Sequence, residues 1–197
     1  REVLRHGQYI MGPEIRELEE KLAGYVGSRH ALSCSSGTDA LLMALMAYDV
    51  GPGDAIFTTP FTFVATAEVI TLLGAVPVFV DIDPKTFNID PVHLEKAIAA
   101  LENKDAKQYP LPAGYENLSP KGIIAVDLFG QCADYDRIRK IAAENGLFVL
   151  EDAAQSFGGR YKGKMACNLT DIAATSFFPA KPLGCYGDRG MVFTEDD

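Results

Sequence analysis

The sequence is poor in the features on which several classes of protein depend. Its 18 lysines and arginines are outnumbered by 27 aspartates and glutamates, which leaves a formal net charge of −9. Proteins that wrap nucleic acid phosphates need a basic face, so this acidic composition argues against a nucleic acid-binding protein. No apolar run approaches the ~20 residues of a membrane span, and no signal peptide opens the chain. We therefore expect a cytoplasmic protein with neither nucleic acid nor membrane as its partner.

Metal-binding patterns are absent as well. The cysteines, Cys34, Cys132, Cys167 and Cys185, form no CxxC pair, and the three histidines form no HxxxH pattern. Zinc and redox sites depend on such spacings, so we predict no metal site and expect free thiols in a reducing cytoplasm.

Nucleotide-binding fingerprints are missing or incomplete. GxGxxG, the usual dinucleotide motif, does not occur. The segment from Gly158 to Lys164 fits the GxxxxGK part of a P-loop, but Met165 stands where Ser or Thr binds magnesium. Neither a leading strand nor a following helix is evident there, so we expect no nucleoside triphosphate site.

What the sequence does contain is an alternation of strand-like and helix-like segments. Apolar runs of strand length occupy residues 30–34, 55–58, 76–80, 123–126, 147–150, 172–178 and 191–193, and most are separated by apolar residues at helical spacing. This α/β pattern predicts a mostly parallel sheet flanked by helices on both faces. Residues 102–120 are polar and contain three prolines, which indicates a surface loop or insertion.

Ligands of parallel sheets bind at the carboxyl ends of the strands, where three motifs stand out. After residues 30–34 comes a turn that opens a helix, and its free N–H groups are suited to an anion. Within this turn, Gly37 allows close approach and Thr38 adds a hydroxyl. The alternative is an ordinary helix cap.

The other two motifs carry a carboxylate and an amine. Asp152 follows residues 147–150 and can hold a cation or a protonated ring nitrogen, or else serve as a cap or a buried ion pair. Lys181 precedes Pro182, which disfavours helix, and its apolar neighbours favour the neutral, nucleophilic amine. The alternative is an ordinary solvated lysine. An anion cradle, a ring-nitrogen carboxylate and an imine-forming lysine are the three parts that pyridoxal phosphate requires.

Three segments resemble the sugar-nucleotide aminotransferases, which are pyridoxal phosphate enzymes of fold type I in the aspartate aminotransferase superfamily: Cys34–Leu41 (CSSGTDAL), Glu151–Gly158 (EDAAQSFG) and Ser176–Asp188 (SFFPAKPLGCYGD). The resemblance extends over the chain apart from residues 102–120. It implies that residues 1–197 are the N-terminal part and the large cofactor-binding domain of a longer homodimeric enzyme, without its small C-terminal domain.

The resemblance also implies a role for individual residues. Lys181 and Asp152 are the implied catalytic residues: Lys181 bonds the cofactor and moves a proton, and Asp152 pairs with the ring nitrogen. Gln155 is expected to bind the phenolic oxygen and Phe63 to stack on the ring. The phosphate contacts are assigned to Gly37, Thr38 and Ser176, and the sugar-nucleotide contacts to Gly7 and Tyr9.

The activity implied is transfer of the amino group of glutamate to a nucleotide-linked keto sugar. The most similar enzymes act on a UDP-linked 3-keto-glucuronate derivative (UDP-2-acetamido-2-deoxy-3-oxo-glucuronate), in surface polysaccharide or lipopolysaccharide biosynthesis. A 4-keto-hexose aminotransferase and a non-catalytic pyridoxal phosphate-binding paralogue are the alternatives. A sugar dehydratase of the same fold is disfavoured, since it has His in place of Lys181.

Two residues depart from the family pattern. Ala180 stands where the most similar enzymes usually have a substrate-contacting Ser, and Arg189 stands where the family usually has Gly. If that Gly is needed for a positive φ, Arg189 is strained.

Overall fold

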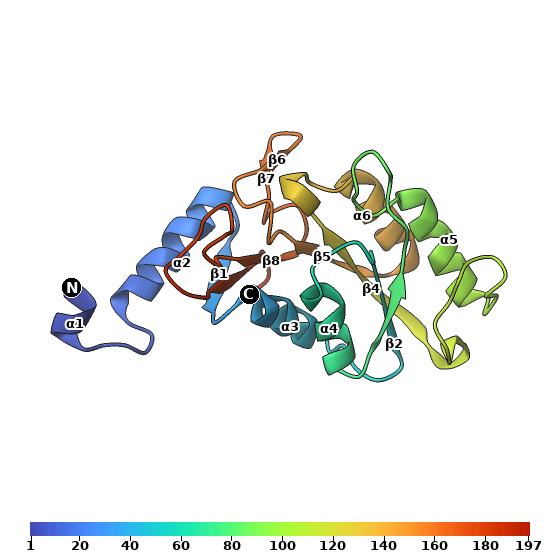
Figure 1. Ribbon diagram of the computed structural model, residues 1–197, viewed down its shortest axis with the longest axis horizontal. Helices are drawn as coiled ribbons and strands as arrows, with labels where there is room; N and C mark the ends of the chain where they lie inside the picture. Colours follow the sequence, from blue (N-terminus) through green and yellow to red (C-terminus); the bar gives the residue numbers. More distant parts are fainter.

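A seven-stranded sheet of order β1-β9-β8-β5-β4-β2-β3 forms the centre of the computed structural model, which describes residues 1–197 (Figure 1). Strands β3, β2, β4, β5 and β8 pair in parallel, and β9 is antiparallel to both β8 and β1. The bounds are His30–Cys34 (β1), Asp54–Thr58 (β2), Val76–Phe79 (β3), Ser119–Val126 (β4), Phe148–Asp152 (β5), Ile172–Ser176 (β8) and Gly190–Thr194 (β9). The mostly parallel α/β sheet expected from the sequence is confirmed.

Side-chain capping starts three of the helices. Ser36, Asp90 and Asp134 each accept a hydrogen bond from a backbone N–H of the first turn that follows. Pro13 occupies the first position of another helix, where its missing N–H costs nothing. The helices are Glu2–His6 (α1), Pro13–Val26 (α2), Gly37–Ala47 (α3), Ala65–Leu72 (α4), Pro91–Glu102 (α5) and Tyr135–Asn145 (α6), with 3₁₀ turns at Tyr115–Asn117 (η1) and Leu128–Gly130 (η2).

Helices cover both faces of the sheet because alternate strand residues are apolar on both sides. Leu150 of β5 packs in the cluster formed with α3 and α4, whereas its neighbour Val149 packs in the cluster formed with α5 and α6. A third cluster joins α2 to β9 on the same side as α5 and α6 (Figure 1). The pleat therefore turns successive side chains of β5 toward different helices, which matters for Glu151 and Asp152.

The partial P-loop match is a β-hairpin. Residues Arg160–Tyr161 (β6) and Lys164–Met165 (β7) pair antiparallel around Lys162 and Gly163, whose φ angles are 49° and 91°. Two successive positive φ angles are typical of a tight hairpin turn. No helix begins there, so this segment lacks the helix N-terminus with which a P-loop receives a phosphate.

The segment between α5 and β4 is irregular but partly anchored. It includes η1, and it sends Tyr109 and Leu118 into the core beside α5. The Tyr109 hydroxyl oxygen accepts a hydrogen bond of 3.0 Å from the Asp81 N–H. Ser119 and Pro120, at the end of the segment predicted as a loop, already belong to β4, which starts before the strand expected from Ile123.

The first twelve residues form an arm. Helix α1 lies away from the sheet at one end of the molecule (Figure 1), and it contributes no buried residue. Leu4, Tyr9, Ile10 and Met11 are all exposed apolar side chains of this arm. None of the helices combines the length and apolarity needed to cross a membrane.

Candidate active site

A cavity of about 520 Å³ opens at the carboxyl edge of the parallel strands. It is bounded by the start of α3, the loop before α4, the end of β5 and the loop after β8. Every residue expected to contact the cofactor lines it, namely Gly37, Thr38, Phe63, Asp152, Gln155, Ser176 and Lys181. Gly37 and Lys181, which are 144 positions apart in the sequence, thus line the same cavity.

One wall of the cavity is the N-terminus of α3. The Asp39 N–H is bound by the Ser36 hydroxyl at 3.0 Å and the Ala40 N–H by the Ser36 carbonyl oxygen at 3.0 Å. The N–H groups of Gly37 and Thr38 take part in no hydrogen bond within the chain. Two free donors with a helix dipole behind them form an anion site.

Glycine at position 37 is required by the neighbouring strand. A Cβ at Gly37 would lie only 2.6 Å from the Cβ of Ser176, which is shorter than any van der Waals contact. The absence of that side chain lets the start of α3 and the end of β8 meet at the cavity. The Ser176 hydroxyl therefore lies beside the free N–H groups of α3.

The strain predicted for Arg189 is wrong. Arg189 is not among the residues with positive φ, and its carbonyl oxygen accepts a hydrogen bond of 2.7 Å from the Phe177 N–H. The position that needs glycine is the next one, because a Cβ at Gly190 would overlap the carbonyl group of Ser36. The constraint is close approach between backbones and not a left-handed conformation.

Asp152 lies at the end of β5 and points toward α4. Its Oδ2 accepts a hydrogen bond of 2.8 Å from the Thr66 hydroxyl, and its Oδ1 accepts one of 3.2 Å from the Ala154 N–H. Burial raises the pKa of Asp152, while the bonds from Thr66 and Ala154 and the charge of Lys181 act to lower it. The carboxylate is desolvated without a close ion-pair partner, so a cationic donor in the cavity would stabilise it.

Glu151 points to the opposite face. It accepts hydrogen bonds from the N–H groups of Cys167 (2.6 Å) and Leu169 (3.0 Å), and it does not line the cavity. Burial, followed by the nearby charge of Asp127, raises the pKa of Glu151 well above its usual value. Because of the pleat of β5, the Asp152 side chain lines the cavity, whereas the Glu151 side chain holds the loop that contains Cys167 and Leu169.

Gln155 has a fixed amide group. Its Oε1 accepts a hydrogen bond of 2.8 Å from the Phe129 N–H, which leaves the Nε2 donors available to the cavity. Because Oε1 is already bound, Gln155 can offer a ligand the N–H groups of Nε2 as hydrogen-bond donors.

Lys181 is carried by the loop after β8. The Lys181 N–H donates to the Phe178 carbonyl oxygen at 2.8 Å, which folds the loop into a turn. Its side chain is half-buried and makes neither a hydrogen bond nor an ion pair with another residue of the chain. An amine free of protein partners beside a buried carboxylate is available for chemistry.

The remaining predicted positions lie differently. Ala180 lines the cavity, whereas Gly7 and Tyr9 belong to the exposed N-terminal arm and do not line it. Sequence reasoning missed Thr66, which is fully buried and binds Asp152. Thr62 and Thr66 are four residues apart and their hydroxyl oxygens lie 2.8 Å from each other, but this spacing in the sequence gives no indication of Asp152.

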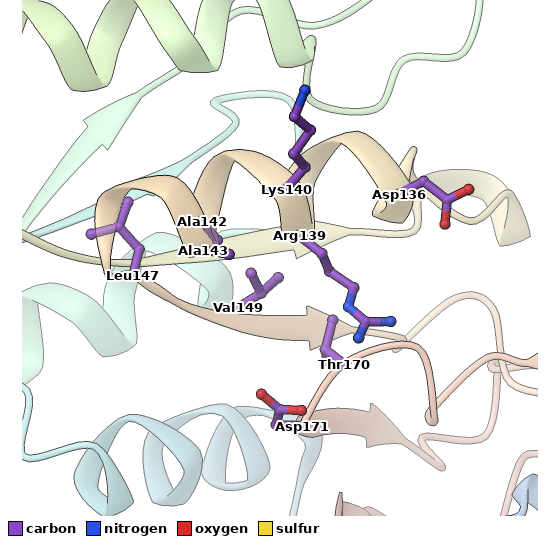
Figure 2. Close-up of a pocket in the computed structure, with 9 residues that line it drawn as sticks. All are labelled: Asp136, Arg139, Lys140, Ala142, Ala143, Leu147, Val149, Thr170 and Asp171. Carbon is purple, nitrogen blue, oxygen red and sulfur yellow. The ribbon is translucent and has the colours of Figure 1, made fainter.

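A second hollow, of about 590 Å³, lies at the opposite edge of the sheet. It lies between α6 and the residues just before β8, and Arg139 and Asp171 point into it while Lys140 points away (Figure 2). Its charged side chains are exposed, and it contains none of the predicted site residues. The carboxyl-edge cavity is therefore the candidate site.

The whole chain, residues 1–197, matches the sequence profile of the DegT/DnrJ/EryC1/StrS aminotransferase family. The chain belongs to this family. It is 56% identical to the UDP-2-acetamido-2-deoxy-3-oxo-D-glucuronate aminotransferase of Pseudomonas aeruginosa, over 99% of this chain and 49% of that protein. The resemblance found in the three motifs is thereby confirmed.

Solved structures of family members share the fold. A DegT DnrJ EryC1 StrS aminotransferase from Brucella abortus is 51% identical with a TM-score of 0.92, over 99% of this chain and 49% of that one. NtdA from Bacillus subtilis, solved with the bound cofactor PMP, is 35% identical with a TM-score of 0.83, over 100% of this chain and 40% of that one. The chain spans about half the length of the relatives it matches.

Proposed function

We propose that this chain is the cofactor-binding half of a pyridoxal phosphate-dependent aminotransferase that moves the amino group of glutamate to a nucleotide-linked keto sugar. The observation that carries the proposal is the convergence of three unlike groups in one cavity. They are the free N–H groups at the start of α3, the buried carboxylate of Asp152 and the unpaired amine of Lys181.

The residues fit the cofactor at both of its ends. The glycine at position 37 lets the start of α3 pack closely against Ser176, and Thr38 and Ser176 add hydroxyls to the anion cradle. At the other end, the raised pKa of buried Asp152 marks a carboxylate that a protonated ring nitrogen would stabilise. Phe63, which is two-thirds exposed, offers a ring face at the cavity wall.

Each residue then has a defined task. When bound, pyridoxal phosphate supplies an electron sink for the carbon that loses a proton. In one half of the reaction Lys181 Nζ would move a proton from Cα of glutamate to the cofactor carbon C4′. In the other half it would move a proton from C4′ to the sugar carbon. Asp152 holds a proton on the ring nitrogen, and Gln155 Nε2 donates to the phenolic oxygen.

The substrate we propose is a UDP-linked 3-keto-glucuronate derivative, used in surface polysaccharide or lipopolysaccharide biosynthesis. The 56% identical relative is named for that activity. Gly7 and Tyr9 are the proposed sugar-nucleotide contacts, and the arm that carries them is exposed and free to meet a ligand or another chain. Ala180 leaves more room in the cavity than the Ser of similar enzymes.

The assembly we propose is a cytoplasmic homodimer. The four cysteines of the chain are free, as in proteins of a reducing compartment. The arm exposes Leu4 and Ile10 to 74% and 90%, and Tyr186 beside the Lys181 loop is fully exposed, so apolar surface is available for a second subunit. Sedimentation of the full-length protein at micromolar concentration tests this assembly, and a monomer would contradict it.

Absorption spectroscopy tests the reaction itself. Adding glutamate to the full-length protein loaded with pyridoxal phosphate is expected to remove the visible band and release 2-oxoglutarate. The UDP-linked 3-keto sugar is then expected to restore the band faster than a nucleotide-linked 4-keto-hexose. A band that glutamate leaves unchanged would indicate a non-catalytic binding module. A preference for the 4-keto sugar would correct the substrate and not the reaction.

A further inference from the structure

Asn88 does not line the cavity, but its side chain binds the turn that carries the hydrogen-bond partner of Gln155. Asn88 lies in the loop between β3 and α5, and it is 3% exposed. Its Oδ1 accepts a hydrogen bond of 3.0 Å from the Leu128 N–H, and its Nδ2 donates one of 2.8 Å to the Gln131 carbonyl oxygen. The two bonds clamp the turn of residues 128–131 from outside the site.

The clamped turn is the one that presents the Phe129 N–H to Gln155. Phe129 has a φ of 58° and Gly130 one of 83°, so the chain passes through two successive left-handed residues. For a phenylalanine this conformation is uncommon and persists only where the surroundings hold it. Here the bonds of Asn88 lie on either side of Phe129, at positions 128 and 131.

The turn is anchored on its other flank by a different residue. The Asp127 carboxylate accepts hydrogen bonds from the Ala133 N–H (2.9 Å), the Tyr135 hydroxyl (2.8 Å) and the Ser156 hydroxyl (2.8 Å). Asp127 thus fixes the ends of the turn, while Asn88 and Gln155 bind polar groups within it through side chains from distant segments.

We infer that Asn88 is a positioning residue for the cofactor: by holding the turn 128–131 it keeps the Phe129 N–H on Gln155 Oε1, and so directs Gln155 Nε2 toward the phenolic oxygen. This inference rests on the proposed function. It extends the polar network of the site by one residue that touches neither cofactor nor substrate. Without the clamp, the turn relaxes and Gln155 loses the partner that orients its amide.

The pH dependence of the cofactor's visible band is the appropriate readout. A hydrogen-bond donor at the phenolic oxygen favours the form of the chromophore that has lost its proton. Removing the donor therefore raises the apparent pKa of the band. Loss of one ordinary hydrogen bond corresponds to a rise of about 0.5–1 pH unit.

The experiment compares Asn88→Ala, Gln155→Leu and the double variant in the full-length protein loaded with pyridoxal phosphate. We expect both single variants to raise the apparent pKa, and the double variant to match Gln155→Leu, because one residue acts through the other. Asn88→Asp, which keeps the acceptor for Leu128 but not the donor for Gln131, is expected to give a smaller rise and serves if Asn88→Ala does not fold.

Asn168→Ala is the matched control. Asn168 also joins two segments, through bonds from Nδ2 to the carbonyl oxygens of Val26 and Gly27, but it lies outside the cavity. It is expected to lower thermal stability without moving the pKa of the band. The positioning role of Asn88 would be overturned if the apparent pKa of the band were unchanged in both Asn88→Ala and Asn88→Asp. It would also be overturned if the shift of Asn88→Ala added to that of Gln155→Leu in the double variant. Either result would leave the proposed function standing. A parent protein with no cofactor band would instead overturn the proposed function.

Discussion

The hydroxyl of Thr66 donates a hydrogen bond of 2.8 Å to the carboxylate of Asp152, joining α4 to the end of β5. Both side chains are buried, and Thr66 is bound in turn to Thr62. Hydrogen bonds to buried charged groups are among the stronger ones in proteins. This bond therefore helps to keep Asp152 ionised and correctly oriented in the cavity.

Thr66→Val tests that role with a nearly isosteric change. Loss of the bond leaves burial to raise the pKa of Asp152 further, so the acid limb of the half-reaction with glutamate is expected to move to higher pH. A rate loss of about tenfold or more at neutral pH corresponds to one hydrogen bond to a charged group. Thr71→Val, on the exposed side of the same helix, is the control and is expected to react like the parent.

Asp152→Asn removes the charge and keeps the shape. We expect the half-reaction with glutamate to slow by about a hundredfold or more, because one preorganised charge in a buried site is worth several kcal/mol. Binding of pyridoxal phosphate is expected to weaken less, since the anion cradle is untouched. Stopped-flow absorption measures the rate, and a rate near that of the parent would show that Asp152 is not the partner of the ring nitrogen.

Gly37→Ala tests the cradle. The added methyl group would lie 2.6 Å from Ser176 Cβ, so α3 and β8 must separate and the affinity for pyridoxal phosphate is expected to fall at least tenfold. Gly24→Ala is the control, because a Cβ there meets nothing within 4 Å and α2 gains a better helix former, worth about 0.5–1 kcal/mol. Equal cofactor affinity in the two variants would exclude close packing at Gly37 as a requirement.

The buried carboxyl group of Asp127 is expected to make the stability of the fold depend on pH. Burial raises the pKa of Asp127 to about 6, against the opposing hydrogen bonds from Ala133, Ser156 and Tyr135. The folded state therefore holds this proton more tightly than the unfolded state does. Its contribution to stability is largest below about pH 4 and declines as the pH rises to about 6.

Asp127→Asn is expected to abolish that part of the pH dependence. Urea midpoints measured between pH 4 and 7 would then fall less steeply with rising pH in the variant than in the parent. Asp49→Asn, a change at an exposed aspartate, is the comparison that corrects for general charge effects. A variant whose midpoints follow the same pH profile as the parent would show that Asp127 does not titrate in this range.

The sequence allowed prediction of those features that local signals encode. Unbroken apolar runs of strand length, and apolar residues at helical spacing between them, sufficed for the order of the main strands and helices. The motifs at Gly37, Asp152 and Lys181 were visible because each follows a strand end, and the ends of parallel strands meet at one edge.

Contacts between distant segments could not be predicted in this way. The pairs Thr66 with Asp152 and Asn88 with Gln131 are separated by 86 and 43 residues, and hydroxyl and amide side chains have many other uses. The β6–β7 hairpin has strands of two residues, too short for an alternating pattern to register. The requirement for glycine at position 190 could not be predicted either, since close approach between Gly190 and Ser36 depends on the tertiary fold.

The proposed function depends above all on Lys181 as the residue that bonds the cofactor. Borohydride reduction of the full-length protein with pyridoxal phosphate, followed by peptide mapping, tests it most directly. We expect one stable pyridoxyl group, located on Lys181, and none on this peptide in Lys181→Ala, which still binds the cofactor through the cradle and Asp152. A label on a different lysine, or no label in a protein that binds the cofactor, would contradict the account.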